Sequence, residues 1–184
     1  ICALFGILMV PVSYAFMRKI SRSTWIASFA ALLMVFDFMH FTLSRIGTID
    51  VIVGFFILLT FYLMYLVLDD LKKGCSWKTV CLMILNGMAA GAASKWTGVY
   101  ACAGIAVLFF TFLFREYGTA AARTRKGMSG QAAISYLAGL SVICIAAYLL
   151  IPAVIYVASY LSYGNGMGNG NVFQTMWENQ QLML

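Results

Sequence analysis

Two acids, the single histidine and one arginine lie close together in the sequence, as Asp37, His40, Arg45 and Asp50. They interrupt a region that is otherwise strongly apolar. Charges in apolar surroundings are costly, so they pair with one another or bind a charged ligand. Two interpretations follow: a structural network of Asp37, Arg45 and Asp50 that fixes helix ends, or a binding site for a charged ligand.

Arg45 and Lys95 stand apart from the other basic residues. Ten of the 12 Lys and Arg residues fall in three polar breaks, at 18–22, 69–78 and 115–126, whereas these two lie at the opposite ends of the apolar stretches. Short loops that carry Lys and Arg stay on the cytoplasmic face of a membrane. Topology therefore does not explain the two outward cations. Together they would suit a phosphate, because Arg offers a planar fork and Lys a point charge.

The remaining polar residues give weaker signals. A lone His40 suits a hydrogen-bonded helix end, and Trp96 suits either a sugar ring or the membrane interface, so both are candidates for a sugar or interface contact. The five cysteines form no C-x-x-C pair, and the motifs of phosphate-loop ATPases, zinc proteases and serine hydrolases are absent. We therefore expect no metal and no cofactor, and a lipid-linked phosphate rather than a nucleotide.

Composition indicates the class of protein. The chain is 63% hydrophobic and 10% charged, with a mean hydropathy of +0.92. This leaves too little polar surface to cover a soluble globule of 184 residues. We predict an all-α, polytopic integral membrane protein. The net charge of +6 does not indicate a nucleic-acid partner, because the basic residues lie in loops beside the bilayer and face anionic lipid.

About six apolar segments are long enough to span a bilayer, which takes about 20 residues or somewhat fewer with snorkelling flanks. Their ranges are 1–17, 23–41, 49–68, 78–94, 98–114 and 131–157. Alternate threading puts the basic breaks in the cytoplasm and the linkers 42–48 and 95–97 outside. Small residues from Gly87 to Ala93 permit close helix approach. The alternative for 78–114 is one bent helix, which would place the charge of Lys95 inside it.

The character of the chain changes near residue 163. Residues 1–163 form the predicted helix bundle with an outward-facing site. Residues 164–184 combine a Gly- and Asn-rich external linker with the start of an amphipathic external segment. Because the chain begins at Ile1 within an apolar stretch and has no initiator Met, we expect it to be an internal part of a longer protein.

Two motifs stand about 40 residues apart. The first contains Phe36-Asp37, Ser44-Arg45, Asp50 and Gly54-Phe55-Phe56, and the second is Lys95-Trp96-Thr97-Gly98 after a small-residue segment. Together they resemble the protein O-mannosyltransferase family, whose pattern is Asp, Ser-Arg and Asp before a Phe-rich helix, then Lys-Trp-x-Gly. Trp177-Glu178-Asn179-Gln180 also resembles an external segment of bacterial members. Leu43 stands where that pattern has Gln.

The resemblance implies a GT-C glycosyltransferase bundle in a bacterial cell membrane, or in the ER membrane of a eukaryote. Such an enzyme transfers mannose, with inversion, from polyprenyl or dolichyl phosphate to Ser or Thr hydroxyls of proteins on the extracytoplasmic face. Arg45 and Lys95 would bind the donor phosphate, and Asp37 and Asp50 would orient them. The family's proposed general base lies in an external loop that we expect before this chain, so no catalytic residue is assigned within it.

Other membrane proteins fit part of the pattern. A GT-C enzyme that transfers another sugar, such as aminoarabinose, from polyprenyl phosphate would share the lipid-phosphate site. A secondary transporter would also place ionisable residues at helix ends, but it usually shows an internal repeat, and none is visible in this sequence. A non-catalytic scaffold would need no outward cations.

Overall fold

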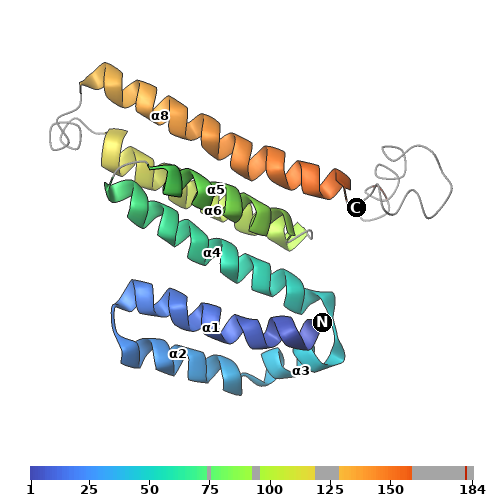
Figure 1. Ribbon diagram of the computed structural model, residues 1–184. Coiled ribbons are helices and arrows are strands. Elements are labelled where there is room, and N and C mark those ends of the chain that lie inside the picture. Colours follow the sequence, from blue (N-terminus) through green and yellow to red (C-terminus); the bar gives the residue numbers. More distant parts are fainter. Residues whose placement is uncertain (74–75, 93–95, 119–128, 159–180, 182–184) are drawn as a thin grey trace.

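The computed structural model describes residues 1–73, 76–92, 96–118, 129–158 and 181, and within these ranges it contains helices and no strand. The elements in chain order are α1 (Cys2–Ser21), α2 (Thr24–Phe36), α3 (Phe38–Ile46), α4 (Ile49–Lys73), α5 (Trp77–Ala92), α6 (Trp96–Leu113), a π-helical turn η1 (Phe114–Gly118), α8 (Gly130–Ile145) and a second π-helical turn η2 (Ala146–Leu150). Figure 1 shows them as a layered bundle of elongated helices. The predicted all-α fold is confirmed.

Most of these helices suit a membrane. Among the described residues, α1, α4, Tyr100–Tyr117 and Ile134–Ala158 are long and apolar enough to cross it, and the bent pair of α2 and α3 gives a fifth candidate. The remaining predicted segment, 78–94, is the fourth in chain order and corresponds to α5, which is apolar but has 16 residues. Such a helix is about 24 Å long, less than the roughly 30 Å hydrocarbon core. The chain is a polytopic integral membrane protein.

Among the described residues, most basic side chains lie at one end of the bundle and Arg45 lies at the other. Arg18 and Lys19 lie in the last turn of α1, Lys72 lies near the end of α4, and η1 contains Arg115. These helix ends gather at the left of Figure 1. The chain reaches α3, which has Arg45 in its last turn, at the right. Which side of the membrane each end faces stays a prediction.

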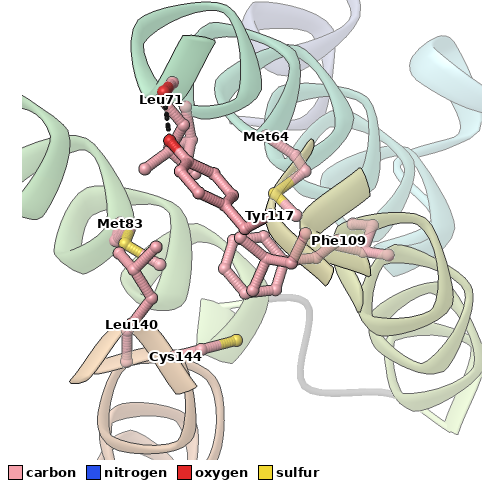
Figure 2. Close-up of a cluster of buried hydrophobic side chains, with 11 residues drawn as sticks. Met64, Leu71, Met83, Phe109, Tyr117, Leu140 and Cys144 are labelled. Atoms are coloured by element: carbon pink, nitrogen blue, oxygen red, sulfur yellow. Dashed lines mark hydrogen bonds between the residues drawn. The ribbon is translucent and has the colours of Figure 1, made fainter. Parts of the chain in front are cut away.

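The main core lies between α4, α5, α6 and α8 with the two π-helical turns. Figure 2 shows side chains from these elements converging on one apolar cluster, which includes Met64, Met83, Phe109 and Leu140. The buried Tyr117 of η1 packs in it, and its hydroxyl donates a hydrogen bond to the Leu71 carbonyl at 3.0 Å. The cluster therefore joins helices that are distant in the sequence.

Helices α5 and α6 are separate helices that pack in the same core. Met83 of α5 and Phe109 of α6 belong to one buried cluster. In a continuous helix these two residues, 26 positions apart in the sequence, would be about 39 Å apart along the axis. The alternative of one bent helix across 78–114 is therefore wrong, because α5 ends at Ala92 and α6 begins at Trp96 as two helices that share one core.

Small residues bring α5 close to the last helix. A Cβ atom at Gly87 would lie only 2.0 Å from the carbonyl oxygen of Ala147 in η2. Beside this contact, the buried Asn86 amide donates to the Tyr148 hydroxyl. The close helix approach that the small residues predict therefore occurs, and its partner is the π-helical turn.

The other part of the bundle, α1 to α3, packs against α4 mainly through aromatic rings of α1. Phe5 and Phe55 have ring centroids 5.2 Å apart, and Phe16 lies 6.0 Å from Tyr62. The Tyr65 hydroxyl adds a hydrogen bond of 3.2 Å to the Lys19 carbonyl. Few residues of these three helices are buried, so specific contacts position them more than a core does.

Candidate functional site

Asp37 divides one predicted apolar segment into two helices. Its backbone is extended, with φ −66° and ψ 110°, and α2 and α3 meet there at a bend of 53°. The Asp37 carboxylate accepts a hydrogen bond of 3.1 Å from the backbone N–H of Met39. This is a helix N-cap, which satisfies a backbone donor that the first turn leaves open. The first helix of the expected span 23–41 therefore ends at Phe36, and the bent pair of α2 and α3 together forms the candidate span.

The predicted linker 42–48 is mostly helical, because α3 continues to Ile46. Gly47 then ends the helix in the left-handed region, with φ 79°, where a side chain would be strained. The Thr48 hydroxyl donates to the Leu43 carbonyl at 3.3 Å and supports this turn. The site residue Arg45 is thus placed in the last turn of a short capped helix rather than in a loop.

The Arg45 guanidinium is exposed and lies over an aromatic ring of its own helix. Its central carbon is 5.1 Å from the centroid of Phe41, one turn earlier. A cation–π contact at an exposed position stabilises by about 0.5–1 kcal/mol. The guanidinium has five N–H donors, and the exposed position of Arg45 leaves it accessible to an anion.

The structure distributes three of the predicted site residues over α3 and the start of α4. Asp37 and Arg45 stand at opposite ends of α3, about 12 Å apart along the axis. Asp37 therefore caps the start of α3, and it does not pair directly with Arg45 at the other end. Asp50 lies in the first turn of α4, close after Arg45 in the chain, where an acid favours the positive end of the helix dipole.

The second cation, Lys95, lies outside the described residues, as does the side chain of Trp96. The backbone of Trp96 begins α6 and Ala92 ends α5, and these two helix ends lie on the side of the bundle at which α3 is found (Figure 1). His40 is half-buried, and its Nε2 lies 3.2 Å from the Gly6 carbonyl oxygen of α1. In this structure His40 contacts a helix backbone.

Comparison with known families decides the family of this chain. The family model of dolichyl-phosphate-mannose-protein mannosyltransferases matches residues 1–161. The chain belongs to this family. The resemblance that the two sequence motifs indicate is thereby confirmed, and the match includes Asp37, Arg45, Asp50 and Lys95.

Relatives of this mannosyltransferase-family chain occur in bacteria and fungi. It is 27% identical over 141 residues to a polyprenol-phosphate-mannose–protein mannosyltransferase of Mycobacterium tuberculosis, covering 66% of this chain and 26% of the relative. It is 26% identical over 166 residues to dolichyl-phosphate-mannose–protein mannosyltransferase 6 of Candida albicans, covering 85% of this chain and 20% of the relative. The chain thus spans about a quarter or less of these proteins. No solved structure matches it significantly.

The sequence alone does not point to two residues near the candidate site, Gly6 and Ser44. A Cβ atom built on Gly6 would lie 2.7 Å from the Ser44 Cβ, so α1 and α3 touch there. Ser44 was visible only as half of a Ser-Arg motif, and Gly6 as one glycine in an apolar stretch. No sequence signal pairs them, because the contact joins residues 38 positions apart.

We predict that the cap oxygen of Asp37, and not its charge, is what α3 requires. Asp37→Asn keeps an effective N-cap and should retain most transfer activity, whereas Asp37→Ala should destabilise the start of α3 by about 1 kcal/mol. Activity and melting temperature of both variants in detergent check this expectation. If Asn is as inactive as Ala, the negative charge itself acts on the site.

Proposed function

We propose that the protein containing this chain transfers mannose from a polyprenyl or dolichyl phosphate to Ser or Thr hydroxyls of proteins on the extracytoplasmic face of a membrane. The observation that carries this proposal is the family match over residues 1–161. The geometry of α3 supports it, since α3 presents an exposed Arg45 away from the end of the bundle where the basic ends of α1 and α4 lie.

In this proposal Arg45 and Lys95 bind the phosphate of the lipid-linked donor. When the acceptor hydroxyl attacks the anomeric carbon, the bond from that carbon to the phosphate oxygen breaks, and the leaving phosphate gains negative charge. Fixed cations in a poorly solvated site stabilise that developing charge, which lowers the barrier. The part of their attraction that already exists in the ground state lowers the donor KM instead.

The other residues take supporting roles in the same proposal. Asp37 caps α3 and so fixes the start of the helix that ends at Arg45. Asp50 begins α4 directly after the α3 terminus and is proposed to orient the cations. The general base that accepts the hydroxyl proton is not assigned to a residue of this chain.

A transfer assay with defined donors tests the proposal. Purified complete protein in detergent receives a Ser/Thr-rich peptide and mannose radiolabelled on a short polyprenyl phosphate. We expect labelled peptide, and no labelling when the donor is a nucleotide-linked mannose. Transfer from polyprenyl-phosphate aminoarabinose but not from the mannose donor would place the protein with another GT-C activity. Absence of transfer from any lipid-phosphate sugar would reject the glycosyltransferase proposal.

The proposed site also requires an orientation in the membrane. In a cysteine-free background, Ile46→Cys beside Arg45 should react with an impermeant thiol reagent from the extracytoplasmic side, and Lys78→Cys only from the cytoplasm. Both side chains are exposed, with Ile46 69% accessible, so burial does not limit labelling. Labelling of position 46 from the cytoplasm would show that the orientation is the opposite one, and that Arg45 does not face the side of the membrane where the acceptor is expected.

A further inference from the structure

Helix α3 holds the proposed phosphate-binding Arg45 but has little to fix it in place. It contains nine residues, and none of them is buried. Its two ends are capped by Asp37 and Gly47. Caps define where a helix begins and ends, but they do not define which way its exposed face points. The orientation of Arg45 must therefore come from contacts of α3 with its neighbours.

One such neighbour is α1, and the contact lies at Gly6. Gly6 is the only buried residue of α1, a helix that is described throughout. A Cβ atom at this position would be 2.7 Å from the Cβ of Ser44, closer than real Cβ contacts occur. A glycine is thus needed here for the two helix backbones to approach, as at small-residue contacts between membrane helices.

His40 adds a polar contact at the same place. Its Nε2 lies 3.2 Å from the carbonyl oxygen of Gly6. Because a carbonyl oxygen only accepts, Nε2 must carry the proton and donate. His40 and Ser44 are one helical turn apart, so both face Gly6 from the same side of α3. Arg45 follows Ser44 directly, and a rotation or shift of α3 against α1 moves its guanidinium.

We propose that Gly6 and His40 form a docking contact that positions α3, and through it Arg45, against the donor phosphate. They are positioning residues and touch no reacting atom. The inference rests on the proposed function, in which Arg45 binds the lipid-linked phosphate. Because a misplacement of about 1 Å can lower a rate roughly 100-fold, we expect this contact to affect the reaction through the placement of Arg45.

A compensating pair of variants tests the contact. Gly6→Ala should lower kcat/KM for the lipid-linked donor about 10- to 100-fold while the KM for the acceptor peptide stays unchanged. Adding Ser44→Gly removes the atom that the new methyl group meets, so the double variant should recover to within about threefold of the wild type. Gly104→Ala and Gly139→Ala are matched controls, since nothing lies within 4 Å of a Cβ atom at either position. A double variant as impaired as Gly6→Ala would overturn the proposal.

The histidine provides a second arm that does not depend on the fold tolerating Gly6→Ala. His40→Gln keeps a donor that can reach the carbonyl and should retain most activity, whereas His40→Leu loses it and should lower donor kcat/KM about tenfold. Equal activity of His40→Leu and the wild type would remove His40 from the docking contact.

A distance measurement separates this inference from the proposed function. Spin labels at Leu4→Cys in α1 and Ile46→Cys in α3, both exposed, report the placement of α3 without any assay of transfer. We expect Gly6→Ala to shift or broaden the distance and Ser44→Gly to restore it. An unchanged distance in Gly6→Ala overturns the docking contact whatever Arg45 does. A fully active Arg45→Ala protein, by contrast, would exclude the phosphate-binding role of Arg45 and would leave the docking contact between α1 and α3 unaffected.

Discussion

Replacement of Arg45 by alanine is expected to lower mannose transfer roughly 100- to 1000-fold, the cost of removing a donor that stabilises transition-state charge. The folded protein should lose little stability, because the contact removed is an exposed cation–π pair with Phe41 worth about 0.5–1 kcal/mol. Transfer kinetics and melting temperature, measured on the same preparation, check both parts. Arg45→Lys should recover little, since a point charge replaces a planar fork.

The chain offers a matched control for Arg45. Arg18 has a similar local arrangement in α1, with its guanidinium carbon 6.0 Å from the ring of Tyr14 one turn earlier. It lies in the last turn of α1, among the ten basic residues of the three predicted cytoplasmic breaks. Arg18→Ala should therefore leave transfer near the wild-type rate. If Arg45→Ala is fully active, or if both variants lose activity equally, Arg45 has a structural role and not a phosphate-binding one.

Lys95→Gln is expected to lower kcat/KM for the lipid-linked donor about 10- to 100-fold, because a charge-assisted hydrogen bond is worth about 1.5–3 kcal/mol. The residue directly precedes α6, whose first turn lies toward the side of the bundle where α3 is found (Figure 1). The loss should appear in the donor kinetics while the melting temperature of the ligand-free protein stays constant. Donor KM, kcat and thermal unfolding of the purified variant are the measurements required.

A lysine that only anchors a helix end at the membrane interface gives the opposite pattern. Such an anchor needs a polar head on an apolar stem, so Lys95→Gln would keep full activity. Lys95→Leu would then impair stability and transfer together, because the polar head that holds the helix end at the interface is lost. Near-normal kinetics of Lys95→Gln would thus exclude Lys95 from the phosphate site.

The apolar stretches and the basic breaks contain most of the information about class and topology. Spanning length and the cost of a charge in hydrocarbon are properties of local composition, so the helices could be predicted from segments such as 49–68 alone. The separation of Arg45 from Arg18, Lys72 and Arg115 along the bundle likewise follows from the alternation of those segments. The family could also be identified from the sequence, because its motifs are short runs of consecutive residues.

Prediction from sequence was less accurate where local signals compete. The apolar run 23–41 favours one continuous helix, whereas the structure breaks it at Asp37, whose carboxylate caps the next helix instead of sitting within one. An aspartate in an apolar run is a signal for such a cap, but the same residue also suits an ion pair with Arg45. The nine-residue length of α3, which separates the two groups, decides between these readings.

The sequence by itself determined that the protein is a helical membrane protein. It also determined that most basic residues lie apart from Arg45, and which two cations are proposed to bind the donor phosphate. Only the tertiary structure decided that α3 lies on α1 through Gly6, Ser44 and His40, and that Gly87 meets Ala147. These contacts join positions that are distant along the chain, and their geometry depends on how whole helices pack, which neither composition nor periodicity encodes. The orientation of Arg45 is therefore determined by helix packing, whereas its charge is evident from the sequence.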